Sequence, residues 1–129
     1  MTQPYRGLRR LLIAHGVITF VAGVLLIVAP NLIPGAAGIT LEPHAYLLAY
    51  LLAGAEFGFS ALSLRGAQLT DAAALSVIVL ACVVFHGSSA LVEGYAITRG
   101  VRAVVWLNVA ARVLVIALFL YLKPRRASA

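Results

Sequence analysis

The chain has 129 residues, of which 63% are hydrophobic and 11% are charged. A soluble core of this size cannot bury so many apolar side chains, so the composition predicts an integral membrane protein. The formal net charge of +6 does not indicate a nucleic-acid partner, because the basic residues flank apolar runs, where they orient a membrane protein. The single cysteine, Cys82, excludes an intramolecular disulfide and a cysteine-rich metal site.

Four apolar runs predict transmembrane helices, over residues 11–29, 45–64, 72–97 and 103–122. Each run has about the 20 residues that cross ~30 Å of hydrocarbon at ~1.5 Å per residue. The first run follows arginines, as in a signal peptide, but its 19 residues are too many and it ends at Pro30-Asn31. We therefore expect a retained span and an all-α, integral membrane four-helix bundle, with one domain over residues 1–129.

The distribution of basic residues predicts the orientation of this bundle. With both termini inside, seven Lys and Arg residues lie on the cytoplasmic side and two lie outside. The inner set is Arg6, Arg9, Arg10, Arg65, Lys123, Arg125 and Arg126, and the outer set is Arg99 and Arg102. The first outer loop, residues 30–44, contains no Lys or Arg. The predicted location is the cell membrane, with several spans and cytoplasmic termini.

Ionisable and amide side chains lie deep inside three of the four runs, at Glu56, His86, Asn108 and Arg112. A charge at the centre of a span costs about 2.5–3.5 kcal/mol on insertion scales, so these groups should face the bundle interior. Glu56 lies nine residues from Arg65, and Arg112 lies eleven from Lys123, a depth difference of only ~3 Å. The spacing predicts a Glu56–Arg112 pair.

One face of the third run carries polar side chains at helical spacing: Cys82, His86, Ser89 and Glu93. In the fourth run, Asn108 precedes Arg112 by about one turn on the same face. Together they predict an inward polar path that runs from Glu93 to Glu56, while Ser60 and Ser63 extend the Glu56 face. Glu93 itself lies six residues from Arg99, which favours its interpretation as a solvated anchor near the outer interface.

Two interpretations of these residues stay open. Ionisable groups at membrane depth indicate a ligand site or a proton-handling site, because Glu and His exchange protons while Arg holds its charge. Alternatively, a buried Glu–Arg pair supported by His and Asn simply fixes the helices in register. The candidate ligand-binding or proton-handling residues are Glu56, His86, Asn108, Arg112 and Glu93. No catalytic residue is assigned.

Two segments share the spacing His-Gly-x6-Gly, from His15 to Gly23 and from His86 to Gly94, which suggests an internal repeat. Depth argues against it. His15 lies five residues from Arg10 and His86 lies fifteen from Asp71, an offset of roughly 15 Å along a helix. We therefore interpret His15 as a shallow residue that either extends toward the headgroups or bonds a neighbouring helix, without a ligand role.

Small residues indicate close packing of the helices. Gly54 and Gly58 flank Glu56 at a spacing that lets backbones approach, either within the chain or between copies. A homo-oligomer or a membrane partner protein therefore stays open. The sequence contains no phosphate-binding loop, His-x-x-x-His motif, nucleophile elbow or cofactor fingerprint, so no metal and no cofactor is predicted.

The layout of four short spans, the long first outer loop, the glycine-flanked acid at 53–58 and the polar third span resembles the small bacterial membrane families of DoxX-like organisation. The resemblance covers most of the chain and implies a four-helix bundle, without an agreed activity or any functional residue. Small multidrug transporters have a similar size, but their signature acid lies in the first span, where this chain has only His15.

Three functions are compatible with these observations. The first is binding of a lipid-like or small amphiphilic ligand, or support of a membrane complex, through the polar cluster. The second is proton-coupled transport by an oligomer, with Glu56 and His86 as titrating groups. The third is an enzyme acting on an isoprenoid or quinone-like substrate, with Arg112 stabilising an anion. We favour them in this order, and an enzyme is the least favoured.

Overall fold

A computed structural model describes residues 5–124 as an all-helical chain. Its helices are α1 (Arg6–Val28), α2 (Leu32–Ala36), α3 (Tyr46–Gly66), α4 (Ala72–Thr98) and α5 (Val105–Leu122), with a 3₁₀ turn η1 (Pro43–Ala45) before α3. Within this part of the chain four helices are long and apolar enough to cross a membrane, as the composition predicts. Arg125 and Arg126, which enter the orientation prediction, lie outside the described residues.

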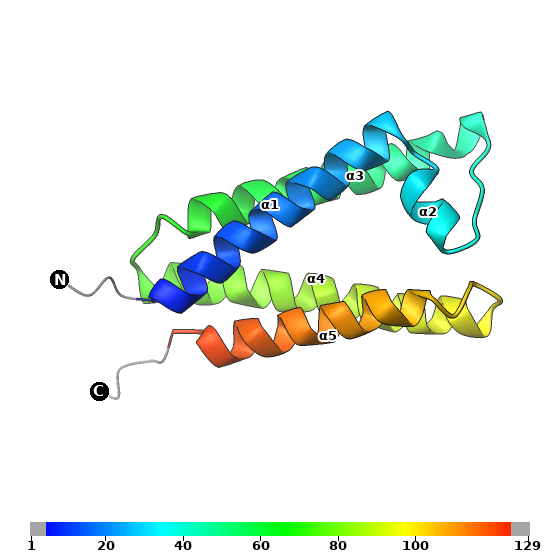
Figure 1. Cartoon of the computed structure of the whole chain (residues 1–129). Helices are drawn as coiled ribbons and strands as arrows, with labels where there is room; N and C mark the ends of the chain where they lie inside the picture. Colours follow the sequence, from blue (N-terminus) through cyan, green and yellow to red (C-terminus); the bar gives the residue numbers. More distant parts are fainter. Residues whose placement is uncertain (1–4, 125–129) are drawn as a thin grey trace.

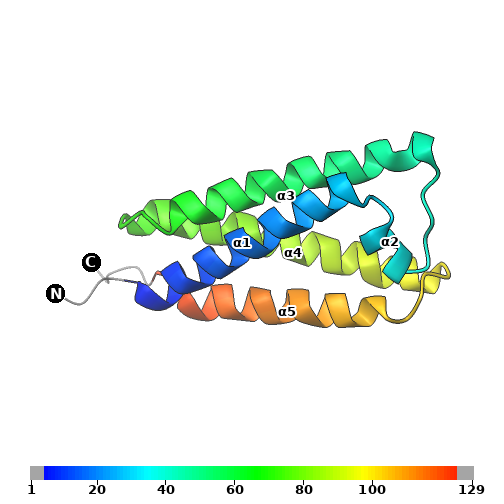
Figure 2. The same ribbon diagram turned by 45° about the horizontal axis from the view of Figure 1, so that its top comes forward.

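The four long helices form two pairs (Figure 1). Helix α1 packs mainly on α3, and α4 packs mainly on α5, while contacts between the two pairs are sparse. The pairs meet at the end where α1 begins and α5 ends, which we call the terminal end, and diverge toward the opposite end, which we call the α2 end (Figure 2). At the terminal end, a Cβ on Gly7 would lie 3.0 Å from the Leu122 side chain.

The hydrophobic core explains why the pairs separate. Near the terminal end, one cluster of buried apolar side chains includes Leu12 on α1, Leu75 on α4, Phe119 on α5 and Ala67 directly after α3, and α3 packs Phe59 and Leu62 against it. Toward the α2 end, a second cluster contains Leu26, Ala49 and Ala53, which belong only to α1 and α3. The two pairs therefore share a hydrophobic core at one end of the bundle.

The loop between α1 and α3 connects the two pairs at the α2 end. Asn31 holds this loop together through hydrogen bonds in both directions with the Leu41 backbone, at 3.0 and 2.6 Å. The Arg102 amide, in the turn between α4 and α5, donates to the Ala37 carbonyl at 3.2 Å. Gly38 has φ +83°, and a Cβ there would lie 2.8 Å from the Arg102 side chain. The sequence did not predict α2, which forms part of this bridge (Figure 2).

Glycines explain the close fit of α1 on α3. A Cβ on Gly16 would lie 2.7 Å from Leu64 Cγ and 3.2 Å from the Ser60 carbonyl, and one on Gly23 would lie 2.7 Å from the Phe57 ring. By contrast, nothing lies within 4 Å of the position of a Cβ on Gly54 or Gly58. The glycines that flank Glu56 therefore do not serve packing within the chain.

Gly16→Ala should destabilise the fold, whereas the matched change Gly54→Ala should not. The added methyl at Gly16 meets Leu64 and the α3 backbone, and overpacking of this kind costs about 1–3 kcal/mol. Circular dichroism during denaturant titration in detergent micelles measures both variants. Equal stability of the two would show that α1 does not lie on α3 as described.

Candidate functional site

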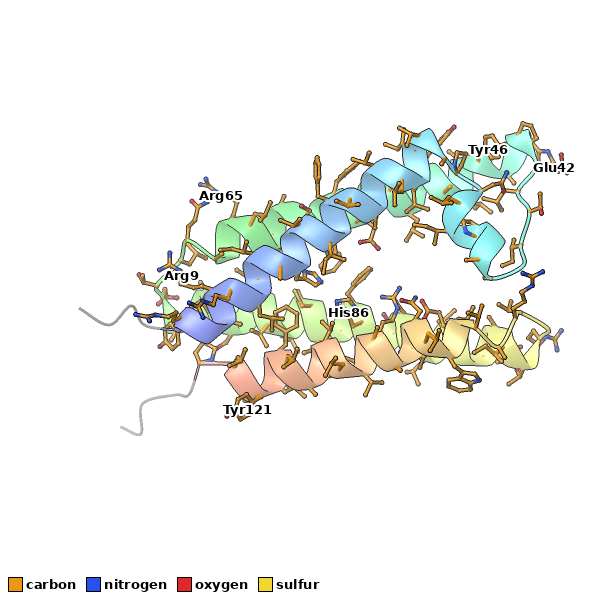
Figure 3. The ribbon with its side chains drawn as sticks, viewed as in Figure 1. Arg9, Glu42, Tyr46, Arg65, His86 and Tyr121 are labelled. Carbon is orange, nitrogen blue, oxygen red and sulfur yellow. The ribbon has the colours of Figure 1, made fainter. Side chains whose placement is uncertain are left out.

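Two buried histidines from different helix pairs are joined by a direct hydrogen bond. The Nε2 atoms of His15 on α1 and His86 on α4 lie 2.8 Å apart, and the two residues are only 6% and 7% exposed. His15 Nδ1 lies 2.8 Å from Ser63 Oγ on α3, and His86 Nδ1 lies 3.3 Å from Arg112 Nη1 on α5. Each long helix contributes one member to this chain, and Figure 3 places His86 near the middle of α4.

Arg112 determines which ring nitrogens carry protons. A guanidinium group only donates, so His86 Nδ1 must accept the hydrogen bond from Arg112. Neutral His86 then carries its proton on Nε2 and donates it to His15 Nε2. His15 in turn holds its proton on Nδ1 and donates it to the Ser63 hydroxyl. The hydrogen bonds therefore have one direction, from Arg112 to Ser63, and the two histidines are opposite tautomers.

Arg112 forms its ion pair with Glu93, at 2.8 Å between Nε and Oε1, and Asn108 donates to the same oxygen at 3.0 Å. The prediction of a Glu56–Arg112 ion pair is therefore wrong. Glu93 lies on α4, which packs closely on α5, whereas Glu56 lies on α3 in the other pair. The interpretation of Glu93 as a solvated anchor is wrong as well, because its side chain is 22% exposed and bound to Arg112.

Two carboxylate groups in the cluster lack hydrogen-bond donors. Glu56 is 8% exposed and makes no hydrogen bond or ion pair with any residue in 5–124, although Arg112 acts on it electrostatically. Glu93 Oε2 is buried and also has no partner within the described chain. A buried acceptor such as Glu93 Oε2, which has lost water and gained no donor, costs about 1–3 kcal/mol, and more when charged. Such groups call for an explanation, which a bound donor would supply.

The face prediction for α3 is confirmed, and that for α4 holds for Cys82 and His86, while Ser89 and Glu93 are only half-buried. Glu56, Ser60 and Ser63 are all buried on α3, and Ser60 donates to the Gly16 carbonyl at 2.7 Å. On α4, Cys82 and His86 are buried together. These polar side chains face the interior, whereas Asn108 on α5, which was predicted to face inward, is exposed. Large apolar side chains on every long helix face outward.

His15 is the functional candidate that the depth estimate missed. That estimate counted from Arg10, but α1 begins at Arg6, because arginine favours the helix and continues its first turn. His15 is nine residues from the start of α1 and His86 is fourteen from the start of α4, so their offset is five residues, or ~7.5 Å. The two imidazole rings extend across this offset and meet at their Nε2 atoms. The shared His-Gly-x6-Gly spacing was the signal that could have identified His15.

The two histidines hold equivalent positions in their helix pairs. Each uses Nδ1 to reach the second helix of its own pair, at Ser63 or Arg112, and Nε2 to reach the other histidine. Ser63 and Arg112 are 49 residues apart. The objection to a repeat from depth is therefore wrong, and the similarity of the two segments extends to their surroundings.

The second glycine of each segment shows the same equivalence. A Cβ on Gly23 would contact the Phe57 ring on α3, and a Cβ on Gly94 would lie 4.0 Å from the Trp106 ring on α5. Phe57 and Trp106 are also 49 residues apart, which matches the separation of Ser63 and Arg112. The equivalence does not extend to the other glycine of each segment, because a Cβ on Gly16 meets Leu64, whereas one on Gly87 would lie 4.0 Å from Ile116, which is 52 residues from Leu64.

Apolar side chains close the histidine pair on its terminal side. The Phe119 ring, fully buried, lies edge-on to His15 with centroids 5.5 Å apart, and Leu12 and Cys82 are also fully buried there. On the other side, Phe85 lies below the Arg112 guanidinium at 5.7 Å and stacks on Phe59 at 4.1 Å. The histidines thus lie between an apolar seal and the charged residues.

The cluster is a set of close contacts rather than an open pocket. A groove of 560 Å³ lies at the terminal end between α4 and α5, lined mainly by apolar residues such as Val79 and Leu120, and contains none of the site residues. Within the described residues, no group of three or more His, Cys, Asp or Glu side chains is arranged to hold a metal ion. A ligand at the cluster would therefore require the two helix pairs to separate.

Comparison of the chain with protein-family models, with curated proteins and with solved structures gave no match.

A double-mutant cycle on Glu93→Gln and Arg112→Met should give a coupling of about 0.5–3 kcal/mol in the free energy of unfolding, because the two side chains form an ion pair. The cycle on Glu56→Gln and Arg112→Met should give a smaller coupling, since no hydrogen bond joins these residues. Denaturant titration in micelles measures both cycles. The reverse order of the two couplings would restore the Glu56–Arg112 pair.

Proposed function

We propose that this chain is a multi-pass protein of the cell membrane, with cytoplasmic termini, that binds an amphiphilic ligand between its two helix pairs. The four apolar helices and the excess of Lys and Arg at the terminal end support the location and the orientation. The ligand's polar head group would lie against Glu56 and Glu93, with its apolar part among the helices. The DoxX-like organisation and a possible homo-oligomer remain predictions.

The unpaired carboxylates carry this proposal. Glu93 Oε2 is a fully buried acceptor without a donor, and the Glu56 carboxylate accepts no hydrogen bond from residues 5–124. If Glu56 and Glu93 are both ionised, Arg112 compensates only one of them and one negative charge is left uncompensated. A head group that brings one positive charge and N–H donors satisfies both requirements. We therefore infer that the ligand is a cationic amphiphile with a protonated amine.

The fold supports entry of such a ligand from the α2 half. There the hydrophobic core belongs to α1 and α3 alone, so the pairs can separate without breaking a core that they share. The bridge between Ala37 and Arg102 crosses the α2 end and closes the direct route along the bundle axis. Access from the side, through the surrounding lipid, suits a ligand that is itself amphiphilic.

Proton-coupled transport is the second candidate. The observation that favours it is the hydrogen-bonded histidine pair, because imidazole is the side chain that changes charge near neutral pH. A proton and an organic cation would also compete for the same negative charge. An assay of cation flux driven by a pH gradient in proteoliposomes distinguishes transport from binding alone.

Glu56→Gln should weaken binding of hexadecylamine at least tenfold, because a hydrogen bond to a charged group contributes about 1.5–3 kcal/mol. Glu42→Gln is the matched control, since Glu42 is an exposed acid in the loop before α3. Native mass spectrometry of the protein, released from micelles of a neutral detergent, counts the bound amine at each concentration of hexadecylamine. Hexadecyltrimethylammonium, which has the charge without N–H donors, should bind more weakly than the amine. Equal binding by both variants would contradict the proposed site.

A further inference from the structure

We propose that the His15–His86 pair is a binding site for one proton, and that uptake of this proton releases Arg112 from His86. The proposal goes beyond ligand binding and does not depend on it. It rests on the order of the hydrogen bonds, in which the first donor is a guanidinium that cannot accept and cannot give up its charge.

Counting protons shows where an added one must appear. If His86 takes it, the ring carries protons on both nitrogens, so Nδ1–H faces the N–H of Arg112. If His15 takes it, His15 Nε2–H must find an acceptor at His86 Nε2, and neutral His86 then carries its proton on Nδ1. Either way His86 Nδ1 becomes a donor. Two donors cannot share a hydrogen bond, so Arg112 must leave while the bond between the histidines is kept.

Charged and titratable groups lie around the pair on three helices, and Arg112 opposes an added proton. Glu56 lies on α3, Glu93 and the Cys82 thiol lie on α4, and Arg112 lies on α5, where it binds both Glu93 and His86. With both acids ionised the sum of the charges is one negative, so a proton makes the cluster neutral. Glu93 Oε2, which has no donor now, is the acceptor available in the cluster for His86 Nδ1–H once Arg112 moves.

The surroundings also determine the side from which the proton comes. Phe119, Leu12 and Leu75 are fully buried on the terminal side of the histidines, and the polar path there ends at Ser63 and the buried Cys82 thiol. On the other side lie Arg112 and Glu93, which are partly exposed, at 17% and 22%. The pair therefore exchanges its proton with the α2 side and does not conduct protons through the bundle in this conformation.

Release of Arg112 changes what the site can bind. While His86 holds Arg112, the guanidinium is occupied by His86 and Glu93. After proton uptake one face of the guanidinium becomes free, and the cluster no longer carries a net negative charge. The affinity for a cationic head group should therefore fall as the pair is protonated.

Solid-state NMR of protein with ¹⁵N-labelled histidine and arginine, in lipid bilayers, tests this directly. Before proton uptake, His15 should be protonated on Nδ1 and His86 on Nε2. As the pH is lowered, His86 Nδ1 should become protonated, and the correlation between His86 and Arg112 should disappear in the same step. Retention of that correlation by a protonated pair would overturn the proposal, as would two histidines that stay neutral down to about pH 4 in folded protein.

Arg112→Gln provides a readout that a change in net charge alone would not move. The glutamine amide can accept as well as donate, so His86 should populate both tautomers before any proton is added. Arg99→Gln, at an exposed position after α4, is the matched control and should leave the tautomers unchanged. If Arg112→Gln also leaves them unchanged, Arg112 does not set the order of the hydrogen bonds and the proposal is wrong. Should this variant fail to fold, the titration of the natural chain decides the question alone.

Discussion

The hydrogen bond between His15 and His86 is a buried polar connection between two helix pairs that also meet through an apolar cluster at the terminal end, the stacked rings of Phe59 and Phe85, and a loop bridge at the α2 end. Because both imidazole rings are buried, each ring nitrogen needs a partner within the protein. Each histidine binds a residue of its own helix pair through Nδ1 and the histidine of the other helix pair through Nε2. The positions of Ser63 and Arg112 follow from that requirement, because each must lie where its histidine's Nδ1 points.

The equivalence of the two pairs gives the site its asymmetry. Both histidines have the same relation to a neighbouring helix, but one neighbour is Ser63, which donates or accepts, and the other is Arg112, which only donates. Because Arg112 can only donate, the chain of hydrogen bonds runs in one direction, from Arg112 to Ser63. The same difference places the charges on one side, since Arg112 brings Glu93 and Asn108 with it, while Ser63 leads toward the apolar seal formed by Phe119.

Sequence reasoning could predict the helices, because their length and hydropathy depend only on local composition. It could also predict that Glu56, His86 and Arg112 face inward, since a charge in lipid is costly. The partner of Arg112 could not be derived, because similar depths leave the rotation and the pairing of helices open, and α4 packs on α5 rather than on α3. His15 was missed because its depth was measured from a charged residue instead of from the start of the helix.

The most direct test of this account is an ¹⁵N–¹⁵N correlation through the hydrogen bond between the two imidazoles, measured on the folded protein in bilayers with labelled histidine. Our account predicts a single cross-peak, from the protonated Nε2 of His86 to the unprotonated Nε2 of His15, that disappears in His15→Gln. His44, which lies in the loop before α3, should give none. Absence of the cross-peak, or the opposite pattern of protonation, would contradict the arrangement on which the site depends.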